Sequence, residues 1–253
     1  MALGKSTAIA NREVIFVDLK FAPNKGEDYV GFRQVISKTP RENVKEGERK
    51  YDYTYETHNF VSGEIVNFRV KEEPRYDNPN EKDFVAYVSF RDEGEPDVVV
   101  RFPLHQQAGR RLVGLIAAAL ERSAGSVYLY TNYAPAGSKI GDKVLEKPQA
   151  YINMKLGDQK GEKLTPLYYD DKGKPMLDEK GKPLPLPMGV KHVIGRKEIW
   201  DFEQANNVVS ATAIVLMDHF RDAHNEHEVS GESFAQEQED DVDLHEAATA
   251  AMR

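Results

Sequence analysis

The middle of the chain contains five short runs in which apolar and polar residues alternate. They are rich in the β-branched and aromatic residues that favour strands, and they lie at residues 62–71, 84–91, 97–102, 127–133 and 150–156. Between the third and fourth runs, residues 106–122 carry apolar side chains at helical spacing, on a face formed by Leu112, Leu115, Ile116, Ala119 and Leu120. This pattern predicts three strands, a helix and two more strands, in that order.

Weaker patterns nearer the N-terminus predict additional strands. Residues 13–19 and 30–37 are strand-like. Tyr51, Tyr53 and Tyr55 alternate with Asp52 and Thr54, a period-2 pattern of residues that favour strands.

The last third of the chain contains an imperfect repeat, DDKGKP at residues 170–175 and DEKGKP at residues 178–183, followed by LPLP. Because Gly and Pro at these positions favour turns, we predict a long, flexible hairpin or arm that leaves the core. Trp200, the only tryptophan, is interpreted as a core anchor rather than as a ring that stacks on a base. Residues 206–219 are largely apolar and predict a second helix, buried in the core or at a subunit interface.

Three strands, a helix and two strands is the element order of the OB-fold, a small five-stranded barrel that binds oligonucleotides. We therefore predict a mainly β protein with an OB-fold-like five-stranded barrel, extra N-terminal strands, a β-hairpin arm, two helices and a disordered acidic C-terminal tail. The predicted divisions are an N-terminal β extension, an OB-like core that includes a basic arm at 157–197, a packing helix and the tail. They cover residues 1–56, 57–200, 201–224 and 225–253.

Alternate residues of a strand point to opposite faces of a sheet, which sorts the predicted strands into an apolar and a polar face. The apolar face, expected to line the barrel, comprises Val66, Phe68, Val70, Phe84, Ala86, Val88, Phe90, Val98, Val100, Phe102, Val127, Leu129, Ile152, Met154 and Leu156. The other face collects cations and aromatic rings from nearly every strand, namely Arg69, Lys71, Tyr87, Arg91, Arg101, Tyr128, Tyr130, Tyr151 and Lys155.

A face of this kind suits single-stranded nucleic acid. Cations follow the phosphates, and any base can stack on a flat ring for about 1–3 kcal/mol, so binding tolerates sequence. We therefore predict that these nine residues bind single-stranded DNA. The alternative is that Arg and Tyr are ordinary residues of a strand face covered by solvent or by a subunit.

The net charge of -8 is concentrated at the C-terminal end. Nine Asp or Glu and no Lys or Arg lie between residues 225 and 252, whereas residues 139–197 contain thirteen Lys or Arg against eight Asp or Glu. We interpret the acidic segment as a tail that competes with DNA for the basic surface or recruits partner proteins, and the alternative is that it serves only solubility. Its partner-binding residues are expected to be Phe234, Glu239, Asp240, Asp241 and Asp243.

Composition and motifs narrow the protein class. The 253 residues include no apolar run long enough to cross a bilayer, and the first residues lack the pattern of a signal peptide. There is no cysteine, which removes disulfides, thiolate nucleophiles and Cys-ligated metals. We expect a cytoplasmic protein without a membrane partner.

No motif predicts an enzyme. A phosphate-binding P-loop and a Gly-x-Ser-x-Gly elbow are absent, and the three histidines at 219–227 lack the His-Glu-x-x-His register of a zinc site. A magnesium nuclease built on the carboxylates at 92–95 is an alternative, although DEGEP is typical of a turn. We therefore expect a non-catalytic protein without a metal or cofactor.

These segments resemble the OB-fold single-stranded DNA-binding proteins of bacteriophages. The resemblance covers about residues 60–220 and rests on SGEIVNFRV, YVSFRDEGEPDVVVRFP, AGRRLVGLIAAAL, VYLYTNY, AYINMKLG and KEIWDF. It implies binding of exposed DNA strands in replication, recombination or repair, homo-oligomers, and an acidic C-terminus that recruits replication, recombination or transcription proteins. A phage-encoded protein would act in the host cytoplasm.

The chain departs from this family in two respects. It ends in LHEAATAAMR instead of an acidic tip with Pro-Phe, and without cysteine it differs from members that hold a structural zinc. The alternative function is a protein-interaction module, with the same barrel serving in a virion component, a transcription cofactor or a host-factor inhibitor. Salt distinguishes the two, because phosphate binding weakens steeply with salt whereas an apolar protein interface responds little.

Overall fold

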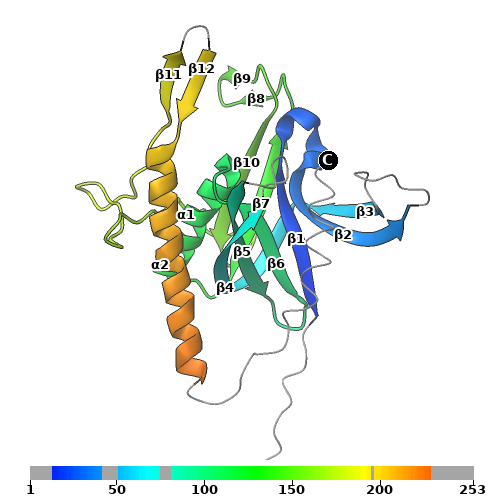
Figure 1. Cartoon of the computed structure of the whole chain (residues 1–253), viewed down its shortest axis with the longest axis vertical. Helices are drawn as coiled ribbons and strands as arrows, with labels where there is room; N and C mark the ends of the chain where they lie inside the picture. Colours follow the sequence, from blue (N-terminus) through cyan, green and yellow to red (C-terminus); the bar gives the residue numbers. More distant parts are fainter. Residues whose placement is uncertain (1–12, 42–50, 75–80, 195–196, 229–253) are drawn as a thin grey trace, which may run out of the picture.

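The computed structural model describes residues 13–41, 51–74, 81–194 and 197–228. Its main element is a curled, half-barrel sheet of eight strands, accompanied by two helices (Figure 1). The fold is mainly β, as predicted. Within the described residues, no helix combines the length and hydrophobicity needed to span a lipid bilayer.

The sheet has the strand order β10-β7-β4-β5-β6-β1-β2-β3. Its strands are β1 (Val14–Phe21), β2 (Val30–Pro40), β3 (Tyr51–His58), β4 (Phe60–Pro74), β5 (Lys82–Arg91), β6 (Asp97–Pro103), β7 (Val127–Ala134) and β10 (Gln149–Leu156). The two helices are α1 (Gln107–Glu121) and α2 (Glu203–Glu228). Smaller elements are η1 (Pro23–Lys25), η2 (Glu27–Tyr29) and the strand pairs β8 (Lys139–Ile140) with β9 (Lys143–Val144) and β11 (Val190–Ile194) with β12 (Lys197–Asp201).

The predicted order of three strands, a helix and two strands is confirmed by β4, β5, β6, α1, β7 and β10. The pairing of these strands differs from that of the expected five-stranded barrel, because β6 has an additional neighbour. β6 pairs in parallel with β1, which pairs in turn with β2. The N-terminal strands therefore continue the sheet, and they cover an edge of β6 that would otherwise expose unpaired backbone groups.

The sheet curls strongly around its core. β2 lies close to β7 although four strands separate them in the strand order. Apolar residues from both strands, such as Phe32 and Leu129, belong to one buried cluster. The curl therefore gives the sheet an inner, apolar face and an opposite, outer face.

β4 bends where it changes neighbours. Its residues 60–63 pair with β7, and residues 64–74 pair with β5. Gly63 lies at this junction with a φ of 136°, and a Cβ there would lie 2.6 Å from the carbonyl oxygen of Arg91. Only glycine fits this bend without strain.

A β-bulge follows in the same strand. It changes which residues of β4 lie on the predicted apolar face. The register shifts between Ile65 and Asn67, so Val66 is the additional residue of the bulge. Ile65 and Phe68 are consequently both buried. The placement of Val66 in the core was wrong, because strict alternation does not anticipate an inserted residue.

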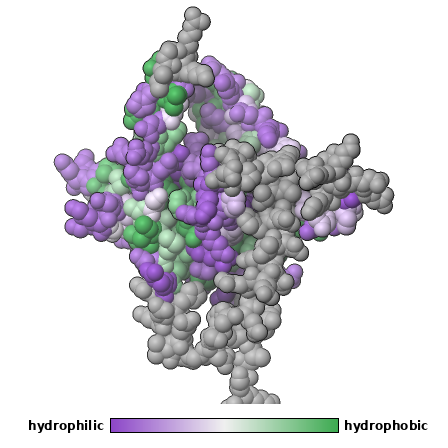
Figure 2. Space-filling model, in the orientation of Figure 1, coloured by the Kyte–Doolittle hydropathy of each residue, from purple (hydrophilic) through white to green (hydrophobic). Residues whose placement is uncertain are grey.

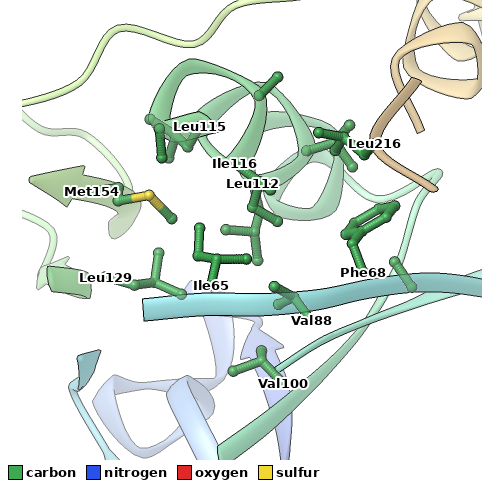
Figure 3. Packing of buried hydrophobic residues seen from close by; sticks show 14 of the residues in the cluster. Ile65, Phe68, Val88, Val100, Leu112, Leu115, Ile116, Leu129, Met154 and Leu216 are labelled. Atoms are coloured by element: carbon green, nitrogen blue, oxygen red, sulfur yellow. The ribbon is translucent and has the colours of Figure 1, made fainter. Parts of the chain in front are cut away.

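The core lies between the inner face of the sheet and α1. Figure 3 shows Leu112, Leu115 and Ile116 of α1 directed at sheet residues, which include Ile65, Val88, Val100, Leu129 and Met154. All eight side chains are buried. Removing this apolar surface from water is the main stabilising contribution to the fold.

The predicted arm divides into two parts: residues 164–169 pack against the core, whereas the DxKGKP repeat at 170–183 is mostly exposed. Leu164, Leu167, Tyr168 and Tyr169 are buried. The amide of Leu167 donates a 2.9 Å hydrogen bond to the carbonyl oxygen of Gly114 in α1, and a Cβ on Gly114 would lie 2.7 Å from the ring of Tyr168. Residues 164–169 therefore belong to the core, because they cover part of α1.

Each copy of the DxKGKP repeat forms a compact turn. Asp170 Oδ1 accepts hydrogen bonds from the backbone amides of Lys172 and Lys174 at 2.9 and 2.8 Å, and Asp178 makes the corresponding bonds in the second copy. These amides hold the pKa of Asp170 below its usual value. The aspartate and a glycine at positive φ, such as Gly173, fix the turn.

The second helix and Trp200 also differ from the predictions. α2 buries only one face, which includes Val209 and Leu216, while Ile214 on the opposite side is exposed. Trp200 is 54% exposed, so the interpretation as a core anchor was wrong. It lies on β12, which among the described strands pairs with β11 alone, in a hairpin that extends beyond the start of α2 (Figure 1).

Candidate nucleic-acid interface

The residues predicted to bind DNA lie on one face of the curled sheet. The observed registers pair Arg69 with Tyr87, Tyr87 with Arg101, and Lys155 with Tyr128. Alternation along these strands puts all of them opposite the core, on the outer face. The full set is Arg69, Lys71, Tyr87, Arg91, Arg101, Tyr128, Tyr130, Tyr151 and Lys155.

Three aromatic rings form what we call the β4–β7 ring cluster, namely Phe60, Tyr128 and Tyr130. Phe60 stacks on Tyr128 with centroids 5.1 Å apart, and Tyr128 lies 5.6 Å from Tyr130. Lys155 Nζ lies 5.7 Å from the centroid of Tyr130. Phe60 is 51% exposed but was not predicted, because β4 begins two residues before the strand inferred from the sequence. The cluster offers flat ring surfaces next to a positive charge.

Two features border this cluster. Tyr151 lies on the edge strand β10, is partly exposed and donates its hydroxyl hydrogen to Gln149. A shallow hollow of about 590 Å³ adjoins Tyr128, and Asp92 and Asp158 are among its lining residues. Those two carboxylates disfavour a phosphate in the hollow, so Lys155 is the better phosphate contact in this region.

Tyr87 carries the central ring of the outer face. The Arg69 guanidinium carbon lies 5.0 Å and Lys71 Nζ lies 5.8 Å from its centroid, within cation–π distance. The Tyr87 hydroxyl donates a hydrogen bond to the carboxylate of Glu73. Burial and this hydrogen bond raise the pKa of Tyr87 above its usual value. Contacts with three residues of β4 therefore hold the ring in place.

Arg101 is enclosed in a charged network. Its guanidinium donates to Asp18 at 3.1 Å and also to Glu73, and the side chains of Arg101 and Glu73 are only 15% and 5% exposed. Burial by itself would lower the pKa of Arg101, but the two carboxylates outweigh it and raise that pKa. Since both carboxylates neutralise the guanidinium, Arg101 stabilises the sheet rather than presenting a charge to solvent.

Arg91 is also paired within the molecule. Its Nη2 lies 2.8 Å and its Nε 3.2 Å from Asp97 Oδ2, in a two-point interaction. These bonds raise the pKa of Arg91. Asp97 is the first residue of β6 and follows the turn from β5, so this ion pair ties the end of β5 to the start of β6.

A second ring cluster on the same face was missed by the sequence analysis. The β2–β3 ring cluster comprises Tyr51, Tyr53 and Tyr55, whose successive centroids are 6.3 and 6.2 Å apart. The guanidinium carbon of Arg33 lies 3.5 Å from the centroid of Tyr55, and Lys38 Nζ lies 4.1 Å from that of Tyr51. Tyrosine at every second position was the available signal, but the partner strand with its cations could not be identified without the fold.

The two ring clusters follow one another along the chain. β3 continues into β4 through Asn59 alone, and four residues separate Tyr55 from Phe60. Their Cα atoms are therefore at most about 17 Å apart, even with the chain fully extended. One bound strand can reach both clusters.

The predicted tail residues Phe234, Glu239, Asp240, Asp241 and Asp243 lie outside the described residues. In the part of the chain that the structure describes, no three His, Asp or Glu side chains gather as metal ligands. Comparisons with protein-family models, with curated proteins and with solved structures find no match.

Proposed function

We propose that the protein binds single-stranded DNA, without catalysis and with little sequence preference, on the outer face of its sheet. The binding set comprises the β4–β7 and β2–β3 ring clusters and the cations beside them. Arg91 and Arg101 are left out as phosphate contacts, because carboxylates already neutralise them.

The observation that carries this proposal is the β4–β7 ring cluster. Large aromatic rings that remain accessible on a sheet face leave apolar surface in contact with water. They therefore suit a partner with flat apolar surfaces. Bases of a single strand provide such surfaces, and each stacked base contributes about 1–3 kcal/mol. In a duplex the same flat surfaces are covered by stacking on the neighbouring base pairs, which favours single strands.

The cations give the proposal its electrostatic part. Lys155 lies over Tyr130, and Lys38 and Arg33 lie over rings of the β2–β3 ring cluster. A base stacked on a ring brings its phosphate within reach of such a side chain. Binding therefore depends on salt, because each phosphate contact releases counterions.

We also propose that β4, β5, β6, α1, β7 and β10 form an OB-like unit in which β1 and β2 complete the curl. The order of the elements supports this assignment. On this proposal the protein acts in DNA replication, recombination or repair, and the acidic residues after 225 compete with DNA or recruit partner proteins.

The test is the affinity of the full chain for a labelled, mixed-sequence single strand, measured by fluorescence anisotropy. The variant Tyr128→Ala/Tyr130→Ala is expected to bind at least about tenfold more weakly, because two stacking surfaces are lost. The matched control is Phe84→Ala. Phe84 was wrongly expected to line the barrel interior, since it is 55% exposed; it lies on the other side of β5 from Tyr87, so its removal is expected to leave affinity unchanged. Equal affinity of the double variant and the unmodified chain would remove the ring cluster from the binding site.

A further inference from the structure

The β11–β12 hairpin exposes apolar side chains on both of its faces. The register pairs His192 with Ile199 and Lys191 with Trp200, so Ile199 and Trp200 project to opposite sides. Val193 is 66% and Ile199 48% exposed. Figure 2 shows apolar surface on this hairpin at the top of the molecule, next to polar residues.

The hairpin is anchored at its base. Phe202, at the end of the hairpin, stacks on Trp200 with centroids 6.4 Å apart and lies 4.4 Å from the guanidinium carbon of Arg110. Among the described residues β11 and β12 pair only with each other, so each has a free edge. A two-stranded hairpin is marginally stable in water, and a free apolar edge is a template for another strand.

The sequence of β12 is complementary to itself when it is paired antiparallel about Ile199. Lys-Glu-Ile-Trp-Asp, at 197–201, then puts Ile199 opposite Ile199 of a second copy. Lys197 comes opposite the second copy's Asp201, and this pair occurs twice because of the two-fold symmetry. Pairing β11 about His192 would instead put two histidines opposite each other and Lys191 opposite Val193, without a complementary charge.

We propose that β12 is a dimerisation strand that pairs with β12 of a second copy of this chain. The two hairpins form one antiparallel sheet of four strands in the order β11-β12-β12-β11. The two Trp200 residues then share one face at diagonal positions, with their Cα atoms about 7–8 Å apart. This proposal does not rest on the DNA-binding proposal, since it uses a different part of the surface.

The test uses the absence of cysteine from the chain. In Ile199→Cys the two new thiols face each other across the symmetry axis, at a separation that suits a disulfide. Mild oxidation of the full chain is expected to convert this variant to a covalent dimer at least about tenfold faster than two controls of similar or greater exposure. The controls are Val193→Cys, on the outer strand of the four, and Ile214→Cys on α2.

A second measurement keeps the proposal falsifiable without a new thiol. Sedimentation velocity of the unmodified chain over a concentration series is expected to show a monomer–dimer equilibrium, which Ile199→Lys shifts to the monomer. A monomer at every concentration would overturn the proposal, and cross-linking of Val193→Cys or Ile214→Cys as fast as Ile199→Cys would overturn the β12 pairing. The affinity of Ile199→Lys for a short single strand of DNA separates the two proposals. If the dimerisation proposal is wrong, this affinity still equals that of the unmodified chain, whereas failure of the DNA-binding proposal would abolish it in both proteins.

Discussion

The centre and the two ends of the outer face contain the same residue types in opposite situations. In the centre, on β1, β4 and β6, the charges of Arg101, Glu73 and Asp18 are satisfied by one another. At the ends, in the β4–β7 and β2–β3 ring clusters, rings lie against rings and cations lie above them. An arginine on a strand face that lies next to a buried carboxylate, such as Arg101, is held in an ion pair within the fold. An arginine that lies over a ring, such as Arg33, is not held by that kind of ion pair within the described part of the chain.

The largest effect expected from this comparison is on stability. Arg101→Ala leaves Glu73 and Asp18 buried without their cation, which is expected to lower the free energy of unfolding by about 3–5 kcal/mol. Urea unfolding measures this loss, with Lys71→Ala as a control that removes an exposed cation of the same face. If Arg101→Ala left stability unchanged but weakened DNA binding, the centre would belong to the interface and the comparison would fail.

The next effect concerns the cluster that the sequence did not reveal. Tyr51→Ala/Tyr53→Ala is expected to weaken single-strand binding about tenfold, because stacking surface is lost at the second cluster. Thr54→Ala, an exposed change on the opposite side of β3, serves as the control in the same anisotropy assay. Unchanged affinity of the double variant would restrict the interface to the β4–β7 ring cluster.

Tyr87→Phe tests the hydrogen bond at the centre of the outer face through the pH dependence of stability. Loss of the hydroxyl bond to Glu73 is expected to cost about 1 kcal/mol of stability near neutral pH. Because the folded-state pKa of Tyr87 is raised above 10.0, the unfolded chain loses this proton first, and stability falls as pH rises above that value. Unfolding at about pH 9 and about pH 11 should therefore show a smaller decline for Tyr87→Phe than for the unmodified protein. Equal declines would contradict the hydrogen bond to Glu73.

The smallest effect is expected for a single cation at the ring cluster. Lys155→Gln should weaken binding only a few-fold at moderate salt while reducing the slope of log affinity against log salt by about 1. Titrations at several salt concentrations measure this slope. An unchanged slope would show that Lys155 does not contact a phosphate.

The element order and much of the outer face could be predicted from the sequence because both depend on local periodicity. Alternation identified the strands that carry Tyr128 and Tyr130, and helical spacing identified α1. Where a strand departs from strict alternation of apolar and polar residues, the sequence contains no local signal. The bulge at Val66 and the early start of β4 at Phe60 were therefore missed.

Other features depend on contacts between distant segments. Arg101 meets Asp18 across 83 residues of sequence, and no local pattern indicates that pairing. Trp200 is apolar, and an apolar residue near a helix is usually buried, but β12 lies in a hairpin that no described layer covers. The face of the sheet on which a residue lies could therefore be predicted more easily than whether its side chain is paired within the fold or exposed.

The central claim is that the outer face binds single strands through stacked bases and phosphates. The most direct test compares the anisotropy of one labelled strand with that of its duplex, at low and high salt, for the unmodified full chain. We predict tighter binding of the single strand and a steep loss of affinity with salt. Absence of binding to the single strand at low salt, or equal affinity for strand and duplex, would contradict the account and would favour a protein as the partner of this face.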